Sequence, residues 1–292
     1  MTETERHLAA LLRVELTAVH QQFLHMLVLR ALRDEGHLAR VTAIDEVDFA
    51  NAMDIAALLV ERGVPVRLPA HLVRPGRDVP SVLRAEWEME EAMAAVLGAA
   101  RAEDDAARDC IARAAAPRAD YRAWLEARLA EAGAPGPDVE TAPELAWVLA
   151  LLTALVEQAM LHAFLSRAEA DGAGADNAWR LSGAAMLYAT AIVRAGLTDG
   201  QGVVPGEVPG VGMAETPEAA FEADMALTRR CVAAARRAAE AQADTEMGGL
   251  CTRIADACDR IAGMERNGTF PDGFGRAPMF DDFEATCARF LS

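Results

Sequence analysis

The chain has 292 residues, a formal net charge of −17 at pH 7 and a hydrophobic content of 52%. This length is enough for one large domain or for two of ordinary size. An acid excess of this size leaves no basic surface to neutralise phosphates, so it argues against binding to nucleic acid and against attraction to anionic membranes. Aromatic residues make up only 5% of the chain, and much of the apolar content is alanine, which favours helix over strand.

Apolar residues recur at helical spacing through the first half of the chain. The pattern predicts helices over residues 2–34, 38–62, 80–102 and 106–132. Gly36 and Gly63 are the predicted ends of the first two helices, because glycine commonly terminates helices. Residues 64–80 contain four prolines, which cannot continue a helix, so they form a long connection between the second and third helices.

The second half of the chain follows the same plan. Its predicted helices cover residues 142–169, 175–195, 217–241 and 244–265, and Gly196 is the predicted end of the second one. A long Gly/Pro-rich connection again separates the second helix from the third, and the segment GAPGPDVETAP separates the two halves. The predicted domains are therefore residues 1–134 and 140–267, followed by a tail over 268–292 that forms a loop and a short helix.

One long middle connection lets a chain cross the length of a four-helix bundle, so that the second and third helices run parallel. Two such connections in matching places predict an all-α protein of two tandem four-helix bundles, or one pseudo-symmetric pair. The strings QQFLHML and QAMLHAFL place His25 in correspondence with His162 and suggest a duplication. The alternative is chance similarity between alanine-rich helices.

Three segments of the first half carry a family resemblance. LLRVELTAVHQQFLH, IDEVDFANAMDIAALLVERGVP and RDCIARAAAPRADYRAWLEARL resemble the first, second and fourth helices of bacterioferritins and related ferritin-like proteins. The resemblance covers about residues 5–132. It implies a ferritin-like bundle with a di-iron site, to which two helices each give a glutamate and two others each give a Glu-x-x-His pair.

Carried over by position, the resemblance implies metal ligands at Glu15, Glu46 and Glu88, with Glu91 as a competitor for the last place. The remaining positions depart from the pattern, so the di-iron site is predicted to be incomplete: Phe49 stands at one histidine position, and Arg118 and Tyr121 stand at the fourth helix's pair. Val47 lies where bacterioferritins carry their haem-ligating methionine, so no haem is implied.

The second half is further from the family pattern. The match of His25 to His162 sets Leu152 opposite Glu15, and it sets the second-helix pair near Trp179 and Ser182. Only Asp224, or Glu222 beside it, provides an acidic counterpart to Glu88.

Three facing carboxylates need a cation, because like charges in a desolvated core repel one another. The cation could be a metal held by Glu15, Glu46 and Glu88 with water or Gln22; such an oxygen-rich site suits manganese, magnesium or calcium and could hold one iron. Alternatively, the Arg118 guanidinium replaces the metal and Tyr121 donates a further hydrogen bond. A third reading is that the glutamates are surface residues in a wrong alignment.

These observations favour a ferritin-like protein with a degenerate di-iron site that acts through binding or assembly, as a homodimer or larger self-assembly. The alternative is a metal-dependent oxidase or oxygenase that uses a reduced carboxylate site in the first half. The sequence names no small-molecule ligand.

The location is predicted to be cytoplasmic. The five cysteines are scattered without a C-x-x-C pair, the first residues are charged without a signal-peptide core, and no stretch of about 18 uninterrupted apolar residues is present. The segment LAWVLALLTALVEQAMLHAFL is therefore expected to be a buried core helix.

Overall fold

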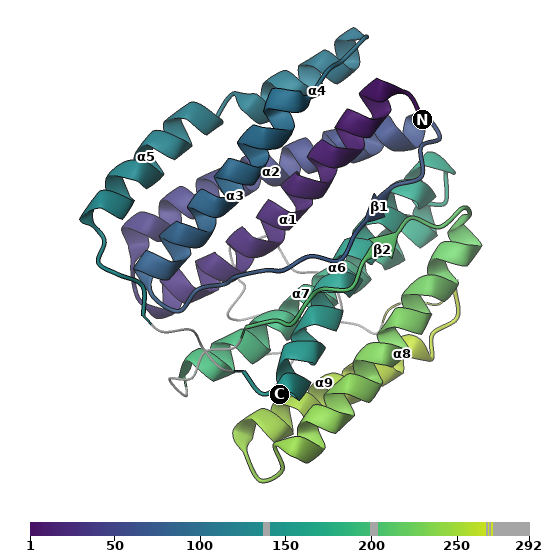
Figure 1. The fold of residues 1–292 in the computed structure, drawn as a ribbon. Coiled ribbons are helices and arrows are strands. Elements are labelled where there is room, and N and C mark those ends of the chain that lie inside the picture. Colours follow the sequence, from purple (N-terminus) through teal and green to yellow (C-terminus); the bar gives the residue numbers. More distant parts are fainter. Residues whose placement is uncertain (137–140, 199–203, 267, 269, 271–292) are drawn as a thin grey trace. The chain divides into compact units, whose positions relative to one another are not determined.

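The computed structural model describes residues 1–136, 141–198, 204–266, 268 and 270, and it divides into two compact units (Figure 1). The first unit contains residues 1–66 and 73–139, and the second contains residues 67–72 and 140–292. Segment 67–72, which the sequence pattern assigns to the first bundle, is thus part of the second unit. The predicted tail over 268–292 lies almost entirely outside the described residues.

Most of the described chain is helical, so the all-α prediction is confirmed. The helices of the first unit are α1 (Glu3–Ala31), α2 (Glu35–Glu61), α3 (Val79–Ala99), α4 (Asp105–Ala115) and α5 (Arg118–Glu131). Those of the second unit are α6 (Pro143–Ala168), α7 (Gly172–Thr198), α8 (Pro217–Ala241) and α9 (Glu246–Ala262). The second and third helices of each unit are separated by a long connection, which covers residues 62–78 in the first unit and includes residues 204–216 in the second.

Several helices begin at a side-chain cap that the sequence supplies. Thr2 and Asp78 form reciprocal capping boxes at the start of α1 and α3, and Asp34 accepts a hydrogen bond from the His37 N–H at the start of α2. Thr216, followed by a proline, caps α8 in the same way. These caps satisfy backbone N–H groups that have no partner within the helix.

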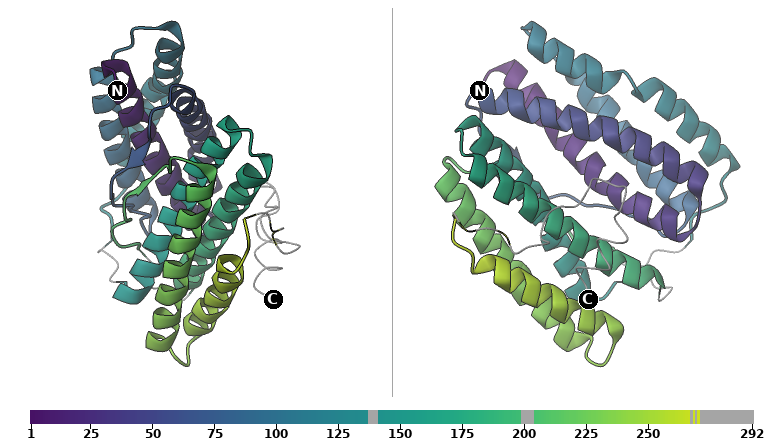
Figure 2. Two further views of the ribbon diagram at one scale, coloured as in Figure 1. Left: turned by 90° about the vertical axis from the view of Figure 1, so that its right-hand side faces the viewer. Right: turned by 180° about the vertical axis from the view of Figure 1, so that it is seen from behind.

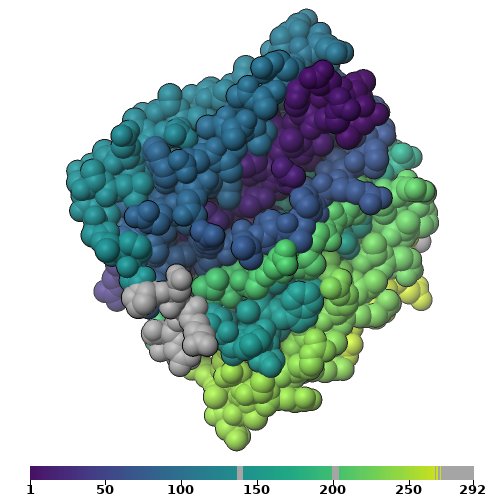
Figure 3. Space-filling view, viewed as in Figure 1, coloured from purple at the N-terminus to yellow at the C-terminus, as the bar shows by residue number. Residues whose placement is uncertain are grey.

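The two units use the same pattern of helix contacts. In the first unit α1 packs against α2 and α3, α2 packs against α4, and α3 packs against α5. In the second unit α6 packs against α7 and α8, and α9 packs against α7 and α8. On the face drawn in Figure 3, α1 and α3 lie side by side at the surface of the first unit.

The fourth helix of the first unit differs from the prediction because it is broken. The sequence pattern indicates one helix over 106–132, whereas α4 ends at Ala115 and α5 begins at Arg118 (Figure 2). Pro117 lies at the break. Proline has no N–H to donate and its ring crowds the preceding turn, so it interrupts the helix there.

Two of the predicted helix ends are also wrong. Gly36 lies in the first turn of α2, and α1 instead ends before a turn in which Arg33 adopts φ 58°. Gly196 lies inside α7, which continues to Thr198. Gly63 does follow the end of α2, with φ 66°, a left-handed conformation that side-chain-bearing residues rarely adopt.

A small strand pair forms within the second unit, which the sequence pattern does not predict. β1 (Arg67–Leu68) pairs antiparallel with β2 (Val211–Gly212), with Leu68 opposite Val211. His71 and Val208 continue the pairing through two reciprocal backbone hydrogen bonds of 3.1 and 2.8 Å. A Cβ atom at Gly210 would lie 2.9 Å from the Leu68 carbonyl oxygen, so this close approach requires glycine.

The core of the second unit surrounds α6. Nearly every residue of α6 from Val148 to Ser166 is buried, and a helix buried on all sides is apolar all round. The core of the first unit is mixed, because polar and charged side chains of α1, α2, α3 and α5 lie inside it.

Candidate functional site: a buried charge network in the first unit

The centre of the network is Arg118, the first residue of α5, and this residue is only 6% exposed. The break at Pro117 interrupts the regular hydrogen bonding of the fourth helix. The Arg118 Nε–H donates to the Ala114 carbonyl oxygen at 3.0 Å, so the side chain partly compensates for the break. The same bond fixes the direction in which the guanidinium points.

The guanidinium contacts carboxyl groups from three other helices. It donates from both terminal nitrogens to Asp48 of α2, with one of the two bonds at 3.3 Å. It donates to Glu90 of α3 at 2.7 Å and lies 3.8 Å from Glu15 Oε2 of α1. One arginine of α5 therefore links this helix to α1, α2 and α3 through charge-assisted contacts.

Three carboxyls share one guanidinium, so they cannot all ionise without a large energetic penalty. Burial, followed by the charge of Asp48, raises the pKa of the Glu15 carboxyl well above its ordinary value. Burial also raises the pKa values of Asp48 and Glu90, although Arg118 acts in the opposite direction on both. The neighbouring carboxylates hold the pKa of Arg118 above its ordinary value despite burial. Burial and the charge of Asp48 therefore favour the protonated form of Glu15.

A second group of polar side chains adjoins the first. The Tyr121 hydroxyl donates to Glu86 Oε2 at 2.8 Å, and His25 Nδ1 lies 2.5 Å from Glu86 Oε1. The other ring nitrogen of His25 donates to the Arg74 carbonyl oxygen at 2.7 Å. Burial, followed by the charge of Glu86, raises the pKa of Tyr121 well above its ordinary value. The phenol is therefore a permanent donor to Glu86.

Asp45 of α2 joins these acids. It is 3% exposed, and burial, followed by the charges of Asp48 and Glu86, raises its pKa well above the ordinary value. Asp45 and Asp48 lie three residues apart on one helix, and this spacing directs both side chains to the same face.

The structure separates the three glutamates that the resemblance brings together. Glu15 lies in the network, but Glu46 is exposed on α2, and Glu88 is exposed and pairs with Arg74 at 2.6 Å. Glu91 is exposed as well. The inward acids of α2 and α3 are instead Asp45, Asp48, Glu86 and Glu90.

The structure therefore does not bring Glu15, Glu46 and Glu88 together in one set. In the part of the chain that the structure describes, no group of three or more His, Cys, Asp or Glu side chains has an arrangement that could hold a metal ion. Gln22, considered above as a further ligand, donates to Asp48 Oδ2 at 3.0 Å. Arg118 and Tyr121 lie among the acids.

The second unit has a smaller polar centre. His162 of α6 lies with Nδ1 2.8 Å from Asp224 Oδ1 of α8, and its Nε2 accepts a hydrogen bond from the Ala214 N–H at 3.2 Å. Gln158 also donates to Asp224 Oδ1, at 3.0 Å. Because Nε2 is an acceptor here, the ring proton is on Nδ1 and points at Asp224.

The positions of the second unit that correspond to Glu15 and to the second-helix pair of the first unit carry no acids. Leu152 is buried in the core, Trp179 is half-buried, and Ser182 donates to the Val156 carbonyl oxygen. Glu222 is exposed, so Asp224 is the inward acid of α8. Glu157 is buried elsewhere in this unit, with the His71 Nε2 at 3.0 Å.

Cys110, Cys231, Cys251 and Cys258 are buried free thiols, and Cys287 lies outside the described residues. Burial raises the pKa of Cys251 to about 11 and that of Cys258 to about 12. Such thiols are poor nucleophiles at neutral pH.

Within the described residues, α6 and α7 are long and apolar enough to cross a membrane by length and composition. In the structure 94% of the apolar window of α6 and 67% of that of α7 are buried. Core helices of soluble proteins meet the same test, so the finding is compatible with the predicted cytoplasmic location.

Comparison of the chain with protein-family models, with curated proteins and with solved structures finds no match.

Proposed function

We propose that this is a ferritin-like protein in which an arginine takes the place of the di-metal centre, and that it acts through binding or assembly and not through oxidation. The observation that carries the proposal is the position of Arg118, whose guanidinium contacts Glu15, Asp48 and Glu90. A fixed positive charge surrounded by carboxyls from three helices does electrostatically what a bound metal would do.

The spacing of the buried residues supports the comparison with a di-metal site. Such sites take one acid from each of two helices and an i, i+3 pair from each of the other two. In this chain Asp45 and Asp48 form an i, i+3 pair on α2, and Arg118 and Tyr121 form one on α5. The remaining acids, Glu15 with Glu86 and Glu90, come from α1 and α3. The pair on α5 carries the substitution that would exclude a metal.

A tandem duplication is part of the proposal. Both units set a histidine of the first helix against a carboxylate of the third, through His25 and Glu86 and through His162 and Asp224. In each case the other ring nitrogen contacts backbone of the long connection, at Arg74 or at Ala214. This shared set of contacts favours a duplication over chance similarity between alanine-rich helices.

The test compares bound metal in the wild-type protein and in an Arg118→Gln variant, which keeps a polar side chain but removes the charge. We expect the purified wild type to hold well below one iron or manganese per chain and to show no Fe²⁺ oxidation above buffer. We expect the variant to gain Mn²⁺ binding, seen as a rise in its Tm with added Mn²⁺. Arg128→Gln, a change on the same helix at a side chain that is 39% exposed, is the matched control.

Stoichiometric metal in the wild type, lost on Glu15→Gln, would overturn the proposal and favour a metal-dependent oxidase or oxygenase. The assembly part is tested by sedimentation of the full chain. We expect a homodimer or a larger defined species, and a monomer at all concentrations would leave binding as the only proposed role.

A further inference from the structure

The segment over residues 67–72 is held in the second unit by few buried contacts. It belongs to the connection between α2 and α3, and it pairs through β1 with β2 in the connection between α7 and α8. Leu68 is its only buried residue, whereas Leu72 is 59% exposed. Segments that bury little apolar surface open locally at low energetic cost, so one further contact can decide how often this segment opens.

His71 provides that further contact. Its Nε2 atom lies 3.0 Å from Oε1 of Glu157, in the middle of α6. The Glu157 side chain is 1% exposed and that of His71 is 15% exposed. The reciprocal backbone hydrogen bonds with Val208 hold the His71 backbone in place. A side chain that changes its charge near neutral pH therefore lies against a buried carboxyl.

Glu157 is the charged group that contacts the His71 ring from the elements around it, among the residues that the structure describes. On the paired connection Val208 lies opposite His71, and the neighbouring Glu207 is exposed. Arg67, at the start of the segment, is exposed as well. The charge of Glu157 is therefore the one to which the protonation of His71 responds.

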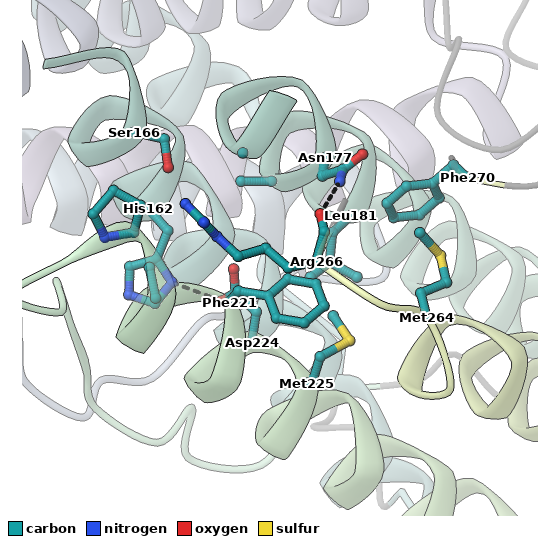
Figure 4. Close-up of a pocket in the computed structure, with 14 residues that line it drawn as sticks. His162, Ser166, Asn177, Leu181, Phe221, Asp224, Met225, Met264, Arg266 and Phe270 are labelled. Carbon is teal, nitrogen blue, oxygen red and sulfur yellow. Dashed lines mark hydrogen bonds and ion pairs between the residues drawn. The ribbon is translucent and has the colours of Figure 1, made fainter. Parts of the chain in front are cut away.

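The other ionisable side chain in the buried middle of α6 is already paired. His162 lies with Nδ1 2.8 Å from Asp224 of α8 (Figure 4). Its Nε2 atom accepts from the Ala214 N–H. Neither His162 nor Asp224 is thus a competing partner for His71.

The contacts of the ring set the pH range in which it is charged. Burial lowers the pKa of His71, but Glu157 and the Pro69 carbonyl oxygen together raise it by more, so the pKa lies above its ordinary value. A histidine with a raised pKa stabilises the closed segment fully below the ordinary histidine pKa. That stabilisation is lost as the pH rises through the value in the folded protein.

We propose that His71 and Glu157 form a pH-dependent latch, which holds residues 67–72 in the second unit near pH 6 and releases them as the pH rises above neutrality. Protonated His71 closes the latch through its ion pair with the buried carboxylate. Loss of the proton removes this ion pair, and the pairing of β1 with β2 then opens more often. The inference goes beyond the proposed role of Arg118 and uses only residues of the second unit.

Hydrogen–deuterium exchange of the full-length protein, measured by mass spectrometry between pH 6 and pH 8.5, tests the latch. Peptides over residues 67–72 and 204–212 report the opening, once their exchange rates are divided by those of the unfolded chain at the same pH. We expect the protection of both peptides to fall at least threefold over this range. Unchanged protection would overturn the proposal, and so would an equal fall in peptides of α9, because the whole unit would then be loosening.

Variants assign the effect to the ion pair. His71→Gln removes the titrating group and should show low protection of residues 67–72 at pH 6, with no further fall up to pH 8.5. Glu157→Gln should give the same result. His37→Gln is the matched control, because it removes another histidine–carboxylate contact, at 2.7 Å from Asp34 in the first unit, and should keep the wild-type trend.

The His71→Gln protein decides the outcome if Glu157→Gln does not fold, because the His71 side chain is partly exposed. A wild-type trend in folded His71→Gln protein would overturn the latch. None of these results bears on the metal content of the first unit, so the two proposals can fail separately.

Discussion

His25 and His162 make the same pair of contacts in their respective units, but with opposite polarity at the backbone. Nδ1 of each ring faces a carboxylate of the third helix, Glu86 or Asp224. Nε2 of His25 faces the Arg74 carbonyl oxygen, whereas Nε2 of His162 faces the Ala214 N–H. One ring must therefore donate where the other accepts.

This difference predicts different protonation patterns for the two rings. His162 should be neutral with its proton on Nδ1, while His25 should carry a proton on Nε2 and share a second one with Glu86. Nitrogen-15 chemical shifts of the rings, assigned through His25→Gln and His162→Gln variants, distinguish these states. Detection of a proton on His162 Nε2 at neutral pH would contradict the contact with Ala214.

Removal of the Arg118 charge should strongly destabilise the first unit. Arg118→Met leaves the Asp48 and Glu90 carboxylates buried without a counter-charge, and breaking a buried ion pair in this way costs roughly 3–5 kcal/mol. The free energy of unfolding from urea titration, followed at a probe in the first unit, measures the loss. We expect Asp48→Asn combined with Arg118→Met to be less destabilising than Arg118→Met alone.

Arg128→Met provides the control for this prediction. Arg128 lies on the same helix and pairs with Glu131, but both side chains are exposed by more than a third. Exposed ion pairs contribute at most about 1 kcal/mol. Equal losses in the two variants would mean that the buried network contributes no more than a surface pair.

The helices could be predicted because their apolar periodicity is strong, and most boundaries differ by only a few residues. The sequence pattern does not predict the break between α4 and α5, because the apolar spacing continues across Pro117. The proline itself is the only local feature that indicates the break. The β1–β2 pair was missed because its two partners are more than 140 residues apart, at Arg67 and Gly212. Pairing at such separation leaves no local pattern to read.

The site was harder to predict than the helices. A shift of one residue turns a side chain by about 100° around a helix, so choosing Glu46 in place of Asp45 exchanges a buried acid for an exposed one. The segment around Glu86, Glu88 and Glu90 makes the same error easy, because it places three acids within five residues. The spacing of Asp45 and Asp48 is the pattern that could have fixed the register.

The buried thiols should be inert in the folded protein. Cys231 and Cys258 are at most 1% exposed, and burial raises the pKa of both thiols above the ordinary value. In a Cys110→Ser, Cys287→Ser variant, reaction with a disulfide reagent should be slow in buffer and should accelerate in urea in step with unfolding. Rapid labelling in buffer would show that α8 and α9 separate in the native state.

The raised pKa of Glu15 predicts how stability depends on pH. Below the ordinary carboxyl pKa, Glu15 is protonated in both the folded and the unfolded chain. As the pH rises above that value, the unfolded chain releases the proton while the folded chain keeps it, so the free energy of unfolding falls. The fall is about 1.4 kcal/mol per pH unit until the pH passes the folded-state pKa.

Glu15→Gln removes this titration and keeps the shape of the side chain. Relative to the wild type, the variant should therefore gain stability as the pH rises from 4 to 8, with the smallest difference at the acidic end. Urea titrations across this range measure the difference, and Glu126→Gln, an exposed change on α5, should show no comparable trend. If the wild type instead gains stability relative to Glu15→Gln as the pH rises, Glu15 is ionised in the folded protein. The effect of the Arg118 charge on the pKa of Glu15 must then exceed the effects of burial and of Asp48.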